Sequence, residues 1–450
     1  MFDRVLVANR GEIAVRVIRA LHELGVEAVA IYSTADRDAL HVRMADHAVC
    51  VGPPPAAESY LRVASVIAAA ETTGCQAVHP GYGFLSENPA FVEACVDNEL
   101  VFVGPPADVM ATMGDKISAK QAMRAADVPT VPGTEGATRL ADVRAVAAEI
   151  GFPVLLKATA GGGGKGMRLV HGADELEDAF RTASAEAEAA FGDGTMYVEK
   201  ALSPARHVEI QVLCDTHANV LTLGERECSI QRRHQKLVEE SPSAALTPET
   251  REAMEAAAER ACRAVGYRNA GTFEFLLGPD GSFYFIELNA RLQVEHPVTE
   301  MCTGIDLVRE QLRVASGEEL VAAGRAPRRG HAIEIRLNAE DPEHDFRPSP
   351  GLVARFRPAQ GPGVRVDTFV ESGTTVPPFY DSMIAKLIVW DADRPSAVAR
   401  AERALRETAI DGVPTTRELA LEVLASEPFR SGDYSTSTLE ALRTENAALA

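Results

Sequence analysis

Short apolar runs alternate with amphipathic stretches over the first part of the chain. Residues 5–8 have the continuous hydrophobicity of a buried strand, residues 12–24 place apolar side chains at helical spacing, and residues 28–32 form the next apolar run. A second unit leads from a helix near 61–70 to a strand at 76–79. This alternation predicts βαβ units and a parallel sheet.

The pattern changes twice more along the chain, and we expect three domains of mixed α/β and α+β class. The first covers residues 1–113. The second, residues 114–328, contains nearly all of the unusual polar clusters. A basic stretch with proline and glycine at 325–330 then leads into residues 329–445, which combine β-rich segments with a helix near 395–407.

The composition is that of a globular protein with an acidic balance. Of 450 residues, 46% are hydrophobic, and 45 Lys plus Arg against 65 Asp plus Glu give a net charge of -20. This charge would repel a phosphate backbone, so we expect no nucleic-acid partner. No signal region precedes the first strand and no apolar stretch is long enough for a bilayer, so we expect neither secretion nor a membrane. Seven scattered cysteines without a CxxC pair predict reduced thiols in a cytoplasmic protein.

A glycine run follows the apolar segment 154–158. Four glycines at 161–164 are followed by Lys165 and Gly166. Free backbone N–H groups can wrap phosphate oxygens, and the lysine adds positive charge. Met167 comes next, so the GK[ST] sequence of a P-loop is absent. A flexible linker is the commoner meaning of such a run, but strand-like sequence on both sides favours a phosphate-binding lid.

Two strand-like segments are joined by Gly-Pro-Asp-Gly at 278–281, which predicts an antiparallel hairpin. If Leu277 pairs with Ser282, Glu274 lies diagonal to Glu287 on the same face of the sheet. Two carboxylates would then converge.

The second segment alternates polar and apolar residues as far as residue 295, which predicts one polar face. That face carries Glu287, Asn289, Arg291, Gln293 and Glu295. A solvated sheet face is the alternative reading. However, Glu274, Glu287 and Asn289 offer the hard oxygen ligands of a Mg²⁺ site. Arg291 offers a planar fork for a small oxyanion, and Glu295 offers a base.

A basic cluster occupies residues 226–236, with three Arg, one His and one Lys in an acidic chain. Such clusters are usually solvated, but a polyanionic ligand would need these local cations. The strand-like segment 206–212 precedes it and places His207, Glu209 and Gln211 on one face.

These segments, in this order, resemble the biotin carboxylases of the ATP-grasp superfamily over essentially the whole chain. The matching segments are 7–14, 79–88, 114–116, the glycine run, 225–236, 287–296, 334–340 and 380–386. The resemblance implies a Rossmann-like N-terminal domain, a central ATP-grasp domain with a glycine-rich lid, and a β-rich C-terminal domain.

The resemblance also implies a role for individual residues. ATP would be bound by Lys116, Lys157, Gly162, Gly163, Gly164, Lys165, Gly166, Glu199, Lys200, Leu202, His207, Gln231 and His234. One or two Mg²⁺ ions, which Mn²⁺ could replace, would be bound by Glu274, Glu287 and Asn289. The catalytic residues would be Glu295, Arg291, Arg336 and Lys236. Bicarbonate and biotin would contact Tyr82, Lys236, Arg291, Gln293, Val294, Glu295 and Arg336.

The implied reaction is an ATP-dependent ligation. Glu295 would deprotonate bicarbonate, which attacks the γ-phosphate of ATP to give ADP and carboxyphosphate. Carboxyphosphate would release phosphate and CO₂, and the phosphate would take the ureido proton of biotin. Arg336 would steady the deprotonated biotin that captures CO₂. In family members with a fused carrier the biotinylated lysine lies between methionines, and no Met here adjoins a Lys. We therefore expect biotin on a separate biotin carboxyl carrier protein or domain. The resemblance also implies a carboxyltransferase partner and a homodimer.

Two other readings stay open. One is a different ATP-grasp ligase that forms acyl phosphates, such as half of a carbamoyl phosphate synthetase or a purine-pathway carboxylase. The other is a nucleotide-responsive scaffold without catalysis. The segment 287–296 and Arg336 favour the carboxylase. The resemblance implies the first half-reaction of an acetyl-CoA or acyl-CoA carboxylase, which feeds malonyl-CoA to fatty acid synthesis. The sequence leaves propionyl-CoA and pyruvate pathways open.

Overall fold

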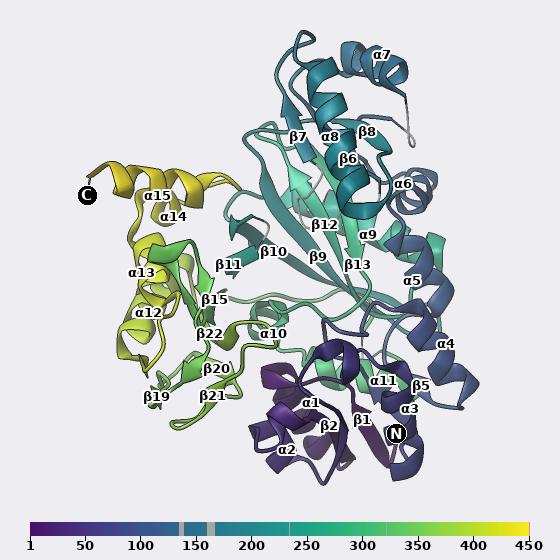
Figure 1. The fold of residues 1–450 in the computed structure, drawn as a ribbon, viewed down its shortest axis with the longest axis vertical. Helices are drawn as coiled ribbons and strands as arrows, with labels where there is room; N and C mark the ends of the chain where they lie inside the picture. The colour runs from purple at the N-terminus through teal and green to yellow at the C-terminus, as the bar shows by residue number, and fades with distance from the viewer. Residues whose placement is uncertain (135–138, 160–166, 234, 321, 450) are drawn as a thin grey trace.

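The computed structural model describes residues 1–134, 139–159, 167–233, 235–320 and 322–449. Figure 1 shows an N-terminal part in purple, a central part that rises into a small upper lobe, and a C-terminal part in green and yellow. In these ranges, none of the helices combines the length and hydrophobicity that a bilayer span requires.

A five-stranded parallel sheet forms the N-terminal part, in the order β3-β2-β1-β4-β5. Its strands are β1 (Arg4–Val7), β2 (Glu27–Ser33), β3 (His47–Gly52), β4 (Ala77–His79) and β5 (Val101–Phe102). Its helices are α1 (Gly11–Glu23), α2 (Leu40–Met44), α3 (Val63–Thr73), α4 (Pro89–Asp97) and α5 (Ala107–Gly114). The predicted parallel sheet is confirmed. The sequence did not reveal β3, because half of its residues are exposed and it lacks a long apolar run.

A nine-stranded sheet runs through the central and C-terminal parts, in the order β13-β12-β9-β10-β11-β15-β22-β20, with β14 beside β10. Its strands are β9 (Arg206–Cys214), β10 (Val220–Arg232), β11 (Gln235–Ser241), β12 (Asn269–Leu277), β13 (Phe283–Asn289), β14 (Gly324–Arg325), β15 (His331–Asn338), β20 (Val364–Thr368) and β22 (Met383–Asp391). Around it lie α6 (Lys116–Ala125), α9 (Pro248–Val265), α10 (His296–Thr303) and α11 (Leu307–Ala315). Because β11 pairs with β15, one continuous sheet crosses the domain limit expected near residue 328. The domain limits themselves stay predictions.

The upper lobe is a three-stranded sheet, β7-β6-β8, with its own core. It consists of β6 (Val154–Ala158), β7 (Met167–Val170), β8 (Met196–Lys200), α7 (Leu140–Ile150) and α8 (Leu176–Phe191). Val154, Leu156 and Ala158 are buried in this core, so the alternation of β6 turns Lys157 to the other face. The strands on either side of the glycine run pair antiparallel, as the lid hypothesis requires.

The C-terminal part packs helices and short strands against β15 and β22. The short strands are β16 (Glu340–Asp341), β17 (Arg347–Pro348), β18 (Gly351–Leu352), β19 (Arg355–Arg357), β21 (Thr375–Val376) and β23 (Ala409–Asp411). The helices are α12 (Arg394–Glu407), α13 (Arg417–Ala425), α14 (Glu427–Ser431) and α15 (Thr438–Leu449). The helix predicted near 395–407 is confirmed as α12. This packing fixes β15, which carries Arg336.

Candidate active site

The β12–β13 hairpin sets Glu274 directly opposite Glu287. The predicted register, with Leu277 against Ser282, is wrong, because Leu277 pairs with Phe283. A β-bulge between Glu274 and Phe275 then shifts the pairing by one residue and removes the expected diagonal offset. The two carboxylates converge more closely than the sequence predicted.

The expected strand to residue 295 is also wrong, because β13 ends at Asn289. The chain then turns into α10, which starts at His296 with Pro297 in its first turn. The polar residues still gather, through side-chain contacts instead of strand alternation. Arg291 Nη2 donates to Asn289 Oδ1 at 2.8 Å, and its Nη1 donates to Gln293 Oε1 at 3.1 Å.

Glu274 is the centre of this group. Its Oε1 accepts from Asn289 Nδ2 and Gln293 Nε2, both at 2.9 Å, and its Oε2 lies 2.8 Å from His207 Nε2. Burial alone would raise the pKa of Glu274, but Lys236 and His207 outweigh it and hold the pKa well below its usual range. Glu274 is therefore ionised at neutral pH.

Glu287 is the second carboxylate of this group, opposite Glu274. It is exposed, whereas Glu274 and Asn289 are buried. Partial desolvation and the charge of Glu274 raise the pKa of Glu287. Adjacent carboxylate and amide oxygens suit a hard divalent cation. By donor chemistry, Glu274, Glu287 and Asn289 fit Mg²⁺ or Mn²⁺.

Lys236 lies in a cage of three buried carboxylates. Its Nζ is 2.5 Å from Glu295 Oε1, 2.7 Å from Glu209 Oε2 and 3.0 Å from Glu274 Oε1. Burial opposes its charge, but the surrounding acidic groups raise its pKa well above the usual value. Glu209, Cys228 and Glu295 could also bind a metal by spacing. We do not assign one there, because the ammonium group already neutralises two of these three residues.

A fully buried arginine supports this cage from β10. Arg226 Nε donates to Glu209 Oε1 at 2.5 Å, and its Nη1 donates to Gln211 Oε1 at 2.7 Å and to Thr299 Oγ1 at 3.0 Å. Arg226 belongs to the basic cluster at 226–236, but its sequence position alone indicated no role for it. The period of 2 that placed His207, Glu209 and Gln211 on one face was the available signal, and that placement is confirmed by their shared partners.

Arg336 joins β15 to Glu295. Its Nη2 donates to Glu295 Oε2 at 2.9 Å and its Nε donates to Glu239 Oε1 at 2.6 Å. Burial would raise the pKa of Glu295, but Lys236, Arg336 and Arg226 together hold it well below the usual value. The candidate base is therefore ionised and bound by two cations.

Tyr82 and Val294 are linked through Glu12 and Lys386. The Tyr82 hydroxyl donates to Glu12, whose Oε1 lies 3.1 Å from Lys386 Nζ. The same ammonium donates to the Val294 carbonyl oxygen at 2.8 Å. Sequence reasoning gave no role to Glu12 or Lys386, although both lie in segments that carry the resemblance.

Glu87 is another residue that sequence reasoning missed. It lies just before α4, and its Oε2 accepts from Arg291 Nε at 2.8 Å, while its Oε1 accepts from the backbone N–H of Ala290 at 3.0 Å. Glu87 thus connects the N-terminal part to the predicted oxyanion residue. Its sequence neighbourhood has no period that points toward Arg291.

The predicted nucleotide residues of the upper lobe gather on Glu199. Lys157 Nζ lies 2.6 Å from Glu199 Oε2, and Lys120 of α6 pairs with Oε1. Burial and the neighbouring Lys116 lower the pKa of Lys157 to about 8.

The other predicted ATP residues that the structure describes differ in their surroundings. Lys200 points away from it and donates to the carbonyl oxygens of Gly151 and Phe152, both at 3.0 Å. Leu202 follows β8 and is half-buried. Gln231 Nε2 lies 3.3 Å from His207 Nδ1. Gly162, Gly163, Gly164, Lys165, Gly166 and His234 lie outside the described residues.

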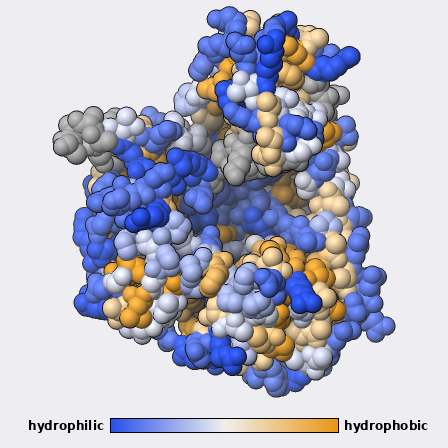
Figure 2. All heavy atoms as spheres, viewed as in Figure 1, coloured by the Kyte–Doolittle hydropathy of each residue, from blue (hydrophilic) through white to orange (hydrophobic). Residues whose placement is uncertain are grey.

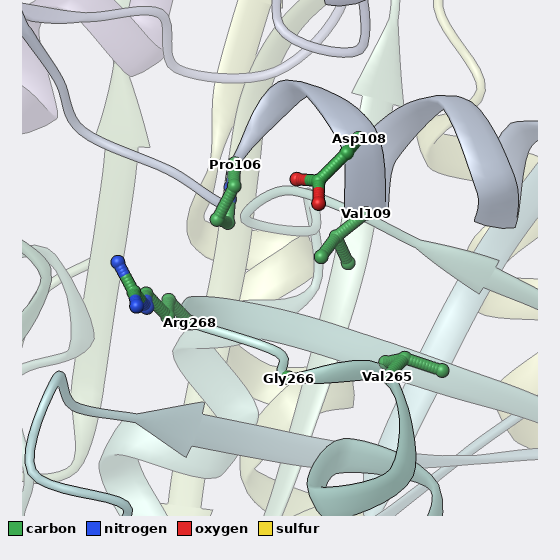
Figure 3. Close-up of a pocket in the computed structure, with 6 residues that line it drawn as sticks. All are labelled: Pro106, Asp108, Val109, Val265, Gly266 and Arg268. Atoms are coloured by element: carbon green, nitrogen blue, oxygen red, sulfur yellow. The ribbon is translucent and has the colours of Figure 1, made fainter.

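Figure 2 shows the molecule hollowed below the upper lobe, and the floor of this hollow is hydrophilic. A second, shallow hollow lies elsewhere, between the start of α5 and the turn after α9 (Figure 3). It is lined by Pro106, Asp108, Val109, Val265, Gly266 and Arg268. None of these is a predicted site residue, and the acid and base groups converge elsewhere. The charged cluster is therefore the candidate active site.

Comparisons with known proteins identify the family. Residues 1–110 match the model of the biotin carboxylase N-terminal domain, residues 334–441 that of the biotin carboxylase C-terminal domain, and residues 115–323 that of the carbamoyl-phosphate synthase L chain ATP binding domain. The biotin carboxylase of Nostoc sp. is 52% identical over 441 residues, which cover 98% of this chain and 99% of that protein. The chain belongs to the biotin carboxylase family. It is accordingly an enzyme of the ATP-grasp ligase class.

Solved biotin carboxylase structures share the fold throughout. A Campylobacter jejuni biotin carboxylase, solved as a complex with a β,γ-modified ATP, superposes with a TM-score of 0.94 at 46% identity, covering 98% of this chain and 99% of that one. The biotin carboxylase domain of Hydrogenobacter thermophilus 2-oxoglutarate carboxylase gives a TM-score of 0.92 at 46% identity, with 98% of each chain covered. That domain was solved as a dimer with MgADP, ADP and bicarbonate. The predicted family and three-part fold are confirmed.

Proposed function

We propose that this protein carboxylates biotin on a partner protein, using bicarbonate and ATP and releasing ADP and phosphate. The observation that carries the proposal is the Lys236–Glu295–Arg336 chain of contacts beside the carboxylates Glu274 and Glu287. It combines an ionised candidate base, two cations and a donor set for a metal. The bicarbonate and MgADP bound to the Hydrogenobacter thermophilus domain support the same substrates here.

The base can be activated by its own partners. In the free site Lys236 and Arg336 hold the pKa of Glu295 well below its usual value, so the carboxylate is a weak base. Phosphate oxygens that draw Lys236 toward themselves would weaken its 2.5 Å contact with Glu295. The pKa of Glu295 would then rise as ATP binds. Glu295 would thus become a competent base for bicarbonate when the phosphates are in place.

Arg291 is the proposed bicarbonate residue, together with Gln293 and Val294. Its guanidinium is held by Glu87 and Asn289 at 2.8 Å each, so its position is fixed before substrate arrives. A fixed planar fork suits a flat oxyanion. Arg336 and Tyr82 are proposed to face biotin, and Arg336 would stabilise the deprotonated ureido group.

We propose that Glu274, Glu287 and Asn289 hold one or two Mg²⁺ ions, which Mn²⁺ could replace. When bound, the metal would neutralise charge on the transferring phosphoryl group. The proposed ATP residues are Lys116, Lys157, Glu199, Lys200, Leu202, His207, Gln231, His234 and the glycine run with Gly162, Gly163, Gly164, Lys165 and Gly166. The proposed domain limits are 1–113, 114–328 and 329–445.

The physiological setting is a separate proposal. We place the chain in an acetyl-CoA or acyl-CoA carboxylase, with a biotin carboxyl carrier protein, a carboxyltransferase and a second copy of itself as partners. The free cysteines suit a reducing compartment, and we propose a cytoplasmic location. The 2-oxoglutarate carboxylase among the similar structures shows that this fold also serves ketoacid carboxylation. Assay of the reconstituted complex with acetyl-CoA, propionyl-CoA, pyruvate and 2-oxoglutarate would identify the acceptor.

Steady-state ATP hydrolysis tests the proposed function. The protein should hydrolyse ATP when bicarbonate is present, and free biotin should raise that rate. Turnover that depends on ammonia in place of biotin would favour carbamoyl phosphate synthesis, since one matched model describes that ATP-binding domain. ATP hydrolysis that is indifferent to bicarbonate and biotin would contradict the carboxylase proposal.

A further inference from the structure

Two buried glutamates lie near Arg336, and the proposed reaction does not use them. Glu239 on β11 and Glu334 on β15 are both 0% exposed and are direct partners in the β11–β15 register. Side chains opposed in this way have Cβ atoms about 5 Å apart, within reach of each other's carboxyl groups. Arg336 lies two residues beyond Glu334 and therefore on the same face of β15.

The guanidinium of Arg336 is held between Glu239 and the candidate base. Glu239 Oε1 accepts from Arg336 Nε at 2.6 Å and lies 2.5 Å from its Nη2, which also donates to Glu295 Oε2 at 2.9 Å. Glu239 thus holds the Nε–Nη2 edge of the guanidinium, and Glu295 contacts the same Nη2. Two contacts to one carboxylate oxygen restrict rotation of the group.

The remaining carboxyl oxygens of the two glutamates have no hydrogen-bond partner among the described residues. These are Glu239 Oε2 and both oxygens of Glu334. A buried carboxylate without a partner is costly, whereas one proton shared between opposed carboxyls gives both groups a partner. The orphaned oxygens therefore point to a protonated pair.

The charges around Glu239 and Glu334 are consistent with one proton on the pair. The groups that face it are Arg336, Lys386, Lys236, Glu295, Tyr82 and Cys228. Lys236 already contacts three other carboxylates, and Lys386 already contacts Glu12. These cations therefore cannot neutralise every carboxylate near the pair. Burial raises the pKa of Glu334 well above its usual value and that of Glu239 to about 7, whereas the pKa of Glu295 is held well below normal.

We propose that Glu239 and Glu334 share one proton and that Glu239 is the positioning residue that holds Arg336 against Glu295. The shared proton leaves the pair with a single negative charge, which lies on Glu239 beside the guanidinium. Glu295 then stays ionised as the base. This inference rests on the proposed role of Arg336 toward biotin, and it assigns the pair to the biotin half of the reaction rather than to phosphoryl transfer.

Three variants give a graded test in the full-length enzyme. Glu334→Gln mimics the protonated partner, so biotin-stimulated ATP turnover should stay within about twofold of wild type. Glu239→Gln moves the negative charge onto Glu334 and away from Arg336, and kcat/KM for biotin should fall about tenfold. The double variant removes the charge and should fall further. In Glu239→Gln and in the double variant, the slower bicarbonate-dependent hydrolysis without biotin should fall less than kcat/KM for biotin does, whereas a general loss of structure would lower both equally.

Glu227→Gln is the matched control, because Glu227 is also fully buried with a pKa raised to about 6 but bonds Ser229 and Ser243. It should leave kcat/KM for biotin unchanged. Thermal melting of every variant shows whether the fold is kept. An equal loss in Glu334→Gln and Glu239→Gln would overturn the assignment of the charge to Glu239. An unchanged kcat/KM for biotin in Glu239→Gln would overturn the positioning role.

Infrared spectroscopy of ¹³C-glutamate-labelled protein tests the shared proton without any turnover. The wild-type spectrum near pH 7 should contain a protonated-carboxyl band that is absent from Glu334→Gln and present in Glu227→Gln. Absence of that band from the wild type would overturn the pair. A wild type that shows the band but lacks biotin-stimulated turnover would contradict the proposed function and leave the proton pair intact.

Discussion

The site has a floor, formed by Lys236 with Glu209, Glu274 and Glu295, and this floor and the upper lobe hold their lysines in opposite ways. In the floor, Lys236 touches three carboxylates, and its pKa is raised well above normal. In the lobe, Lys157 contacts Glu199, which also pairs with Lys120 of α6, and burial lowers the pKa values of the two lysines to about 8 and about 7. The floor is therefore assembled before substrate arrives, whereas the lobe keeps cations whose charge a bound phosphate would stabilise.

The largest expected effect comes from replacing the proposed general base, Glu295. Glu295→Gln keeps the size of the side chain but cannot accept the bicarbonate proton, and biotin-dependent ATP turnover should fall about 10³-fold. Steady-state assays with saturating ATP, bicarbonate and biotin measure this loss. Retention of near wild-type turnover would remove Glu295 from the mechanism.

The preassembled floor also predicts a large effect on stability. Arg226→Met leaves Glu209 buried with Lys236 as its remaining cation and should lower the free energy of unfolding by about 3 kcal/mol or more. Arg263→Met, which breaks an exposed pair with Glu259 on α9, should cost less than about 0.5 kcal/mol. Urea unfolding compares the two. Equal costs would show that the floor does not depend on Arg226.

Replacing Glu287 should weaken Mg²⁺ binding without lowering the stability of the fold. Glu287 is exposed, so Glu287→Gln removes a metal ligand without disturbing the core. The Mg²⁺ concentration for half-maximal activity should rise at least about tenfold, the lower end of what even indirect ligand changes cause. A Mg²⁺ titration that matches wild type would contradict the assignment, and the melting temperature should stay unchanged.

The lobe should give the smallest effect, and one that depends on pH. Because the pKa of Lys157 is lowered to about 8, its ammonium loses its proton as the pH rises through that value, and KM for ATP should increase. Lys157→Arg keeps its charge, so the rise should be less than about twofold in this variant over the same range. A KM that rises equally in both proteins would assign the effect to another group.

The sequence predicted the parallel sheet, the hairpin and the lid-flanking strands, because each depends on local periodicity. It could not give the bulge after Glu274 or the end of β13 at Asn289, which depend on pairing and on the start of α10. The roles of Glu87, Glu239 and Arg226 were also beyond it. Their partners lie far away in sequence, and only the folded sheet brings them together.

Isotope transfer from ¹⁸O-labelled bicarbonate shows whether a bicarbonate oxygen attacks the γ-phosphate. In unlabelled water, with ATP, Mg²⁺ and biotin, the account predicts one ¹⁸O atom in each inorganic phosphate released, measured by mass spectrometry. Phosphate that carries only oxygen from water and ATP would show that the metal ligands and Arg291 do not bring bicarbonate to the phosphoryl group.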